Sequence, residues 1–166
     1  NDNAENIDYP NLDARIEETY ASSSVKSTNV RDLYNSYIRA FRWASDRLNQ
    51  KGVIAFVTGS GWVDKTFARG MRKHLAEKFT SIYVVNLRGD IRKNMFSNGA
   101  AGEGENIFGE GSTSGIAITI LVKKENKSST RIFYNDIGEN KTFKEKRDFL
   151  TEKKHIYSIK NNGGFY

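Results

Sequence analysis

The chain has 166 residues, enough for one domain with a hydrophobic core, and 37% of them are hydrophobic, an ordinary globular proportion. The absence of cysteine excludes disulfides, thiolate metal sites and a cysteine nucleophile, and two histidines are too few for a typical zinc site. A formal charge of +6 at pH 7 favours a polyanion such as DNA, although a solvated basic surface explains it equally well.

Two helical segments are expected early in the chain. Residues 12–21 can form a short helix with Asn11 as its N-cap. Apolar residues at helical spacing predict a second helix over residues 30–48, with Asn29 as its N-cap and Gly52 after its end.

A strand–helix–strand unit follows. Residues 53–57 are a continuous apolar run, typical of a strand that is covered on both faces in a parallel sheet. Apolar residues at intervals of four from Val63 to Phe79 predict an amphipathic helix, and residues 82–87 predict a second strand. Such a unit predicts a right-handed parallel crossover.

Residues 88–115 form a long, charged and glycine-rich segment, which predicts either a substrate-contacting loop or a disordered insertion. A phosphate-binding loop is disfavoured, because Ile107 and Ser114 stand where the third glycine of G-x-G-x-x-G is required. Beyond this segment the sequence predicts two strands and a charged helix, at residues 116–122, 131–135 and 141–153.

Ser60, Asp64 and His74 do not form a hydrolytic triad. Thr58 stands where G-x-S-x-G requires a glycine, and Asp64 and His74 share no helix face. We interpret His74 as structural. Phe108 is the more informative residue, since an aromatic in an irregular segment either packs into a core or stacks on a base, which contributes about 1–3 kcal/mol.

The two ends of the chain and the hydropathy pattern bear on its context. The chain opens on Asn-Asp-Asn-Ala-Glu-Asn without Met and closes on Asn-Asn-Gly-Gly-Phe-Tyr, so we expect a segment of a longer protein that begins within a domain. No run approaches the roughly 20 apolar residues of a membrane span, and no signal peptide opens the chain. A cytoplasmic protein without a membrane partner is expected.

Several runs resemble one family of bacterial enzymes. Asp-Leu-Tyr at residues 32–34, Gly-Val-Ile-Ala-Phe-Val-Thr at 52–58 and Gly-Trp at 61–62 resemble the stretch that follows the catalytic tetrapeptide of gamma-type amino-methyltransferases. More narrowly, the chain resembles type ISP restriction-modification enzymes, by its runs at residues 9–20, 37–47, 86–89 and 107–112. The resemblance covers residues 1 to about 124, and more loosely extends to residue 149.

The resemblance implies a fold and a function for the longer protein. The fold is α/β, the C-terminal half of a Rossmann-like S-adenosylmethionine-dependent methyltransferase fold, with a mixed sheet and an antiparallel last strand pair. Residues 1–124 belong to this half-domain, and residues 125–166 form an extension towards a target-recognition region. The longer protein, with nuclease and helicase-like parts, transfers a methyl group from S-adenosyl-L-methionine to the N6 amine of adenine in double-stranded DNA.

The resemblance also assigns site residues. No catalytic residue is assigned, because the [N/D]-P-P-[Y/F/W] tetrapeptide and the cofactor glycine motif are absent, and the chain alone is expected to be inactive. Phe108 matches the aromatic that stacks on the flipped target base. Leu33 and Tyr34 match residues close to the cofactor, although packing of their helix on the sheet explains them equally well.

The remaining expectations concern partners. Arg88, which belongs to a matched run, and Arg92 and Lys93, which are chosen by charge alone, are expected to contact DNA phosphates. The strand from Val53 is expected to leave an unpaired apolar edge, which predicts self-association. No metal site is predicted. A non-catalytic DNA-binding module and a fragment of an RNA or protein methyltransferase remain alternative functions.

Overall fold

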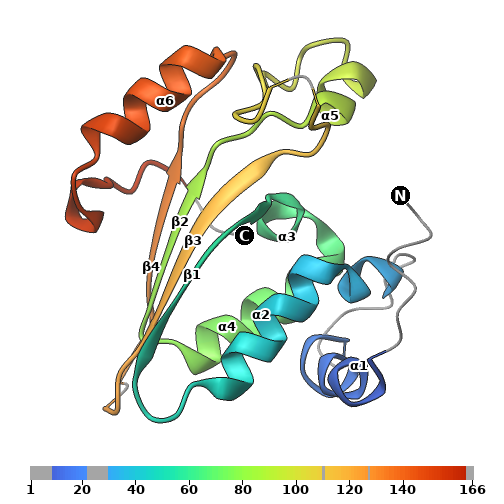
Figure 1. Ribbon diagram of the computed structural model, residues 1–166, viewed down its shortest axis with the longest axis vertical. Helices are drawn as coiled ribbons and strands as arrows, with labels where there is room; N and C mark the ends of the chain where they lie inside the picture. The colour runs from blue at the N-terminus through green and yellow to red at the C-terminus, as the bar shows by residue number, and fades with distance from the viewer. Residues whose placement is uncertain (1–8, 22–29, 110, 127, 164–166) are drawn as a thin grey trace.

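A four-stranded mixed sheet lies at the centre of the computed structural model, which describes residues 9–21, 30–109, 111–126 and 128–163 (Figure 1). In the order β1-β3-β2-β4, the strands are β1 (Gly52–Gly59), β3 (Ile116–Lys123), β2 (Ser81–Asn86) and β4 (Arg131–Asp136). β3 runs antiparallel to both of its neighbours, and β4 pairs in parallel with β2. The α/β class and the mixed sheet are therefore as predicted.

Helices lie on both sides of this sheet (Figure 1). They are α1 (Pro10–Ile16), α2 (Ser36–Arg47), α3 (Gly61–Asp64), α4 (Arg69–Lys78), α5 (Ile91–Phe96) and α6 (Phe143–Glu152). A π-helical turn at Glu17–Ala21 continues α1, and 3-10 turns lie at Val30–Tyr34, Thr66–Ala68 and Ile156–Ser158. Local signals explain several starts: Pro10 occupies the first turn of α1, and Thr142 and Glu145 form a capping box at α6.

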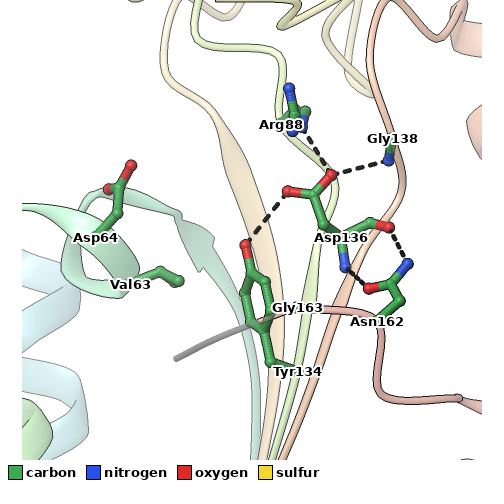
Figure 2. A pocket seen from close by; sticks show the side chains of 8 residues that line it. All are labelled: Val63, Asp64, Arg88, Tyr134, Asp136, Gly138, Asn162 and Gly163. Atoms are coloured by element: carbon green, nitrogen blue, oxygen red, sulfur yellow. Dashed lines mark hydrogen bonds and ion pairs between the residues drawn. The ribbon is translucent and has the colours of Figure 1, made fainter. Parts of the chain in front are cut away.

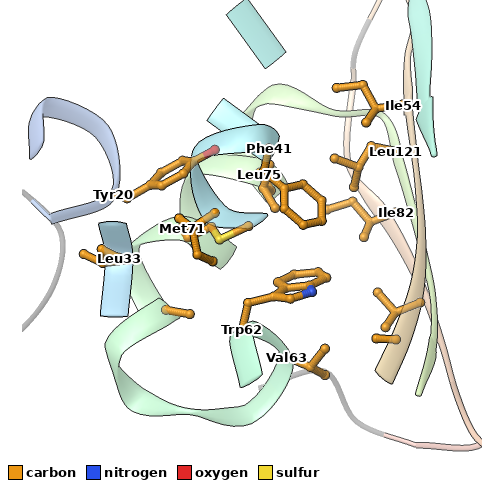
Figure 3. Packing of buried hydrophobic residues seen from close by; sticks show 14 of the residues in the cluster. Tyr20, Leu33, Phe41, Ile54, Trp62, Val63, Met71, Leu75, Ile82 and Leu121 are labelled. Atoms are coloured by element: carbon orange, nitrogen blue, oxygen red, sulfur yellow. The ribbon is translucent and has the colours of Figure 1, made fainter. Parts of the chain in front are cut away.

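The main core lies between the sheet and the layer of α2 and α4 (Figure 3). Trp62 of α3 is fully buried, and its ring lies 5.4 Å from that of Phe41 of α2, between centroids. Leu75 of α4 and Ile82 of β2 are also fully buried. Each such side chain contributes about 1.5–3 kcal/mol through removal of apolar area from water, so this face dominates the stability of the fold.

A smaller core lies on the opposite face, where α6 packs (Figure 1). Phe149 and Leu150 of α6 pack against a cluster that includes Val85 of β2. β1 lies beyond this cover, and its Val53 and Val57 are 61% and 56% exposed. The second face of the sheet is therefore covered over β2 and β4 and open over β1.

The edge of the sheet at β4 is covered, whereas the edge at β1 is open. Asn162 donates from its backbone N–H to the Tyr134 carbonyl at 3.0 Å, and its Oδ1 accepts from the Asp136 N–H at 2.7 Å. The C-terminal segment thus covers the outer edge of β4. β1 lies at the other edge, as predicted, with no further strand beside it among the described residues.

Two expectations about the strands are wrong. The last two strands do not form an antiparallel pair, because β3 is occupied on both sides by β1 and β2, and β4 joins the free side of β2 instead. β1 is not covered on both faces, because its burial alternates between Ile54, which faces the core, and the exposed Val53 and Ala55. A continuous apolar run cannot distinguish a central strand from an edge strand with one open face.

The two long predicted helices are each interrupted. Asn35, with φ −62° and ψ 143°, separates the 3-10 turn Val30–Tyr34 from α2, and Lys65, with φ −72° and ψ 145°, ends α3. Apolar spacing persists across these breaks because the segments on both sides pack on the same core. Asn11 lies inside α1, whose N-cap position is Tyr9, and the predicted cap Asn29 lies outside the described residues.

Candidate nucleic-acid interface

The segment between β2 and β3 leaves the sheet through a tight left-handed turn. Arg88 and Gly89 both have positive φ, at 53° and 88°. A Cβ on Gly89 would lie 2.9 Å from the Cα of Asn106, so the turn requires glycine there. The Asp90 side chain then caps α5 by accepting from the Lys93 N–H at 3.0 Å. We call residues 87–115 the β2–β3 loop.

Asn106 holds this loop together from inside. It is only 3% exposed, and its Nδ2 donates to the carbonyls of Gly89 and Ser114 at 3.0 and 2.7 Å. Its Oδ1 accepts from the Phe108 N–H at 2.9 Å. One buried amide therefore ties the start of the loop to its end and orients the backbone at Phe108.

Glu103 is a second buried polar residue of the loop. It is 4% exposed, its Oε2 accepts from the Asp90 N–H at 3.1 Å, and its Oε1 lies 3.2 Å from Lys93 Nζ. Lys93 Nζ also lies 3.2 Å from Asp64 Oδ2. Burial lowers the pKa of Lys93, but the two carboxylates outweigh it and the net pKa is raised. Lys93 is thus paired within the chain.

Lys146 of α6 is the third buried group. It is fully buried, and its Nζ donates to the carbonyls of Leu87, Glu103 and Glu105 at 2.7, 3.2 and 2.5 Å. Burial lowers the pKa of this ammonium, and nearby Glu103 opposes that effect. The ammonium satisfies three buried acceptors that no apolar side chain would satisfy.

Arg88 points back towards the sheet. Its Nε donates to Asp136 Oδ1 at 2.7 Å, and its Nη1 donates to the carbonyls of Ala101 and Gly102, both at 3.2 Å. Burial lowers the pKa of Arg88, but Asp136 outweighs it and raises the net value. Of the three residues predicted to contact DNA, Arg88 and Lys93 therefore already form ion pairs with carboxylates of this chain.

Asp136 and Tyr134 line a cleft of about 430 Å³ beside Arg88 (Figure 2). The Asp136 carboxylate accepts from Arg88, from the Gly138 N–H at 2.8 Å and from the Tyr134 hydroxyl at 3.3 Å. That hydroxyl in turn accepts from Asn86 Nδ2 at 3.0 Å. Because this carboxylate is already saturated with donors, we assign it a structural role.

The β2–β3 loop presents three large apolar side chains to solvent. Phe108 is 65% exposed, and Met95 and Phe96 at the end of α5 are 72% and 90% exposed. Arg92 is exposed and forms no ion pair among the described residues, and it lines a cleft of about 470 Å³ with Phe96. Phe108 does not pack into the core, so its ring face is available to a partner.

The other two candidate residues belong to the 3-10 turn Val30–Tyr34 and not to this loop. Leu33 is 1% exposed in the main core, and Tyr34 packs partly buried against it, with its pKa raised by burial. Within the described residues there is no group of three or more acidic, histidine or cysteine side chains that could bind a metal ion. No described helix is long and apolar enough to cross a membrane.

Sequence reasoning missed Glu103, Asn106 and Lys146. Polar residues in a glycine-rich segment give no sign of burial, so the first two had no usable signal. Lys146 had one: it stands three residues after Phe143 and three before Phe149, on the apolar side of α6. A lone lysine within an apolar stripe indicates a buried cation with a specific partner.

Comparison with known proteins gives matches among solved structures. No protein-family model and no protein of curated function matches the chain. A nuclease-deletion mutant of the type ISP restriction-modification enzyme LlaGI, solved with a DNA substrate mimic, is 41% identical with a TM-score of 0.86 over 95% of this chain. The ATP-dependent type ISP enzyme LlaBIII bound to DNA is 39% identical with a TM-score of 0.80 over 88% of the chain.

A third structure, the DrdV–DNA complex, is 30% identical with a TM-score of 0.81 over 97% of the chain. The chain spans only 15%, 9% and 15% of the lengths of these three proteins. Over most of its own length, the chain is thus similar in both sequence and fold to one segment of type ISP restriction-modification enzymes.

Proposed function

We propose that the chain is the C-terminal half of the adenine-N6 DNA methyltransferase domain of a type ISP restriction-modification enzyme. It supplies part of the sheet and the DNA-facing β2–β3 loop, and it is inactive alone. The observation that carries the proposal is the 65% exposed Phe108 on a loop held by buried polar groups, in a chain 41% identical to a DNA-bound type ISP enzyme.

In this proposal Phe108 stacks on the flipped target adenine. An enzyme that acts on a base must first take it out of the helix, at a cost of a few kcal/mol. Stacking on an aromatic ring returns about 1–3 kcal/mol. Asn106, which accepts from the Phe108 N–H, fixes the backbone that carries the ring, so little conformational entropy is lost when the base binds.

In this proposal the described residues form only part of the site for S-adenosyl-L-methionine. Leu33 is buried in the core and offers no surface, while Tyr34 remains partly exposed. A cavity at the C-terminal end of β1, lined by Gly59 and Tyr37 among others, measures about 140 Å³, whereas sites for ligands of this size usually need about 300–1,000 Å³. The small size of this cavity supports the proposal that residues from elsewhere in the longer protein complete the cofactor site.

The test is a calorimetric titration of S-adenosyl-L-methionine into this chain and into the full-length protein, followed by a methyl-transfer assay on duplex DNA. We expect binding and adenine methylation with the full-length protein alone. Binding to this chain by itself would place the site within these residues and contradict the half-domain assignment.

A second candidate function is a DNA-binding module without chemistry, which the net charge of +6 and the DNA-bound relatives favour. A full-length protein that binds duplex DNA but neither binds the cofactor nor transfers a methyl group would support this alternative. Methylation of RNA or protein, but not of DNA, would support a methyltransferase with another substrate.

A further inference from the structure

The strongest unexplained feature is the environment of Lys146. Its ammonium is fully buried, and among the described residues its contacts are backbone carbonyls, with no ion pair to a carboxylate. Enclosing a charge in this way is costly unless the donors are matched by acceptors. Here the three donors of the ammonium meet three carbonyls, so the site is built for a lysine.

The acceptors all belong to the β2–β3 loop, at its first residue, Leu87, and in one short stretch further along. The carbonyls of Ala101 and Gly102 face Arg88, and those of Glu103 and Glu105 face Lys146. Four carbonyl groups between residues 101 and 105 are thus turned inward towards two cations. The positive φ of Gly102 and Gly104, 59° and 65°, allows the backbone to turn them inward.

The same stretch is docked on the start of α6. The Glu105 N–H donates to the Lys141 carbonyl at 3.0 Å, and the Glu105 carboxylate accepts from the Phe143 N–H at 2.5 Å. Asn106, the residue that orients Phe108, follows Glu105 directly. A shift of α6 would therefore move the backbone that leads into Phe108.

We propose that Lys146 is a positioning residue for the DNA-facing loop, and that through it α6 sets the position of Phe108. The consequence for the target base rests on the proposed function, whereas the mechanical link does not. Lys146 touches neither base nor cofactor. It acts through the carbonyls of Glu103 and Glu105, so the part of the chain that follows the sheet controls the loop.

The mechanical link is tested on this chain by hydrogen exchange with Lys146→Met, which keeps the apolar stem and removes all donors. The matched control is Lys144→Met on the same helix, whose side chain is 84% exposed. We expect exchange of the amides of residues 101–109 to accelerate at least tenfold, with smaller changes in β2 and β3, and no change in the control. Wild-type exchange in the loop, or equal acceleration in loop and sheet, would overturn the proposal.

Lys146→Gln keeps two donor hydrogens and serves if the methionine variant does not fold. It should give the same pattern with a smaller acceleration, and unchanged loop exchange would overturn the proposal equally well.

The functional consequence is tested in the full-length protein with 2-aminopurine at the target adenine. Lys146→Met should alter the fluorescence of the flipped base and lower kcat at least tenfold, while the affinity for S-adenosyl-L-methionine stays at the wild-type value. A loop that exchanges fast while fluorescence and kcat remain wild type would overturn the positioning role. A wild-type protein without methyl transfer would instead refute the proposed function and leave the exchange result standing.

Discussion

Arg42 of α2 and His74 of α4 form a hydrogen bond between their side chains. Arg42 is 1% exposed, and its Nη1 lies 2.8 Å from His74 Nε2. Because a guanidinium can only donate, Nε2 must accept, and the imidazole is neutral with its hydrogen on Nδ1. Arg42 also pairs with Asp46 and lies 5.5 Å from the Tyr20 ring centroid. His74 is therefore a structural residue.

This contact predicts a pH dependence of stability. Burial, together with Arg42 and Lys78, lowers the pKa of His74 below the ordinary histidine value of about 6.5. As pH falls below about 6.5, His74 takes up a proton in the unfolded chain before it does so in the folded chain. The free energy of unfolding is therefore highest above that pH and decreases as pH falls from the unfolded-state pKa to the folded-state pKa of His74. His74→Gln should reduce the drop in urea midpoint between pH 7.5 and pH 5.5, and an unchanged drop would contradict the assignment.

Gly104 is predicted to be intolerant of any side chain. A Cβ there would lie 2.4 Å from the Lys141 carbonyl oxygen, at a φ of 65°. Gly104→Ala should destabilise by about 1–3 kcal/mol, since backbone must move as well as adopt a strained conformation. The control is Gly109→Ala, at φ 80° with nothing within 4 Å, where only about 1 kcal/mol of strain is expected. An equal decrease in the free energy of unfolding for both variants, measured in urea, would show that the backbone at Lys141 moves away from the new Cβ at little cost.

The sequence predicts the strands well because their signal is local. Expected strands at residues 82–87 and 116–122 correspond to Ser81–Asn86 and Ile116–Lys123. Their order is not local information: β3 lies between β1 and β2, and no pattern within a strand states which neighbours it will have. The helix breaks at Asn35 and Lys65 were missed for a related reason, since both halves pack on one core.

In the candidate site, too, local sequence signals were informative and contacts between distant segments could not be predicted. The position of Phe108 before a strand left open whether its ring packs into a core or is exposed, and Glu103 and Asn106 gave no sign of their burial. Glu103 and Asn106 are buried only because distant segments close around them. The sequence predicted Arg88 as a surface cation, because its partner, Asp136, lies 48 residues further along the chain.

Self-association through β1 is predicted to depend on its open face. Val53 and Val57 are 61% and 56% exposed beside an unpaired strand edge. The double variant Val53→Lys, Val57→Lys should lower the average mass in light scattering while the unfolding midpoint changes little. The control adds the same charge elsewhere, by Trp43→Lys and Tyr157→Lys at exposed positions. A wild-type chain that is monomeric at all concentrations would contradict this prediction.

Phe108→Ala in the full-length protein is predicted to weaken binding of target DNA by about 1–3 kcal/mol and to lower kcat for methylation, because the stacking surface is lost. Phe108→Trp should retain both. Phe96→Ala removes an aromatic that is 90% exposed on the same loop but lies outside the matched run, and it should behave as wild type. The stacking role is rejected if the Phe108→Ala and wild-type proteins bind and methylate alike.

Arg88, Arg92 and Lys93 are predicted to respond differently to neutralisation. Arg92 has no ion pair among the described residues, so Arg92→Gln should reduce the slope of log affinity against log salt by about 0.9 and leave stability within about 0.5 kcal/mol. Arg88→Gln breaks the contact with Asp136 and removes the guanidinium donor from the carbonyls of Ala101 and Gly102, so it should act mainly on stability.

Lys93→Gln should fall between these cases, because its ammonium is shared between Asp64 and Glu103 and is still half exposed. Fluorescence titration of duplex DNA over a range of salt, with urea unfolding of the same variants, separates the two effects. If Arg92→Gln leaves the salt slope unchanged while Arg88→Gln lowers it without loss of stability, the phosphate contact belongs to Arg88, and its ion pair with Asp136 opens on DNA.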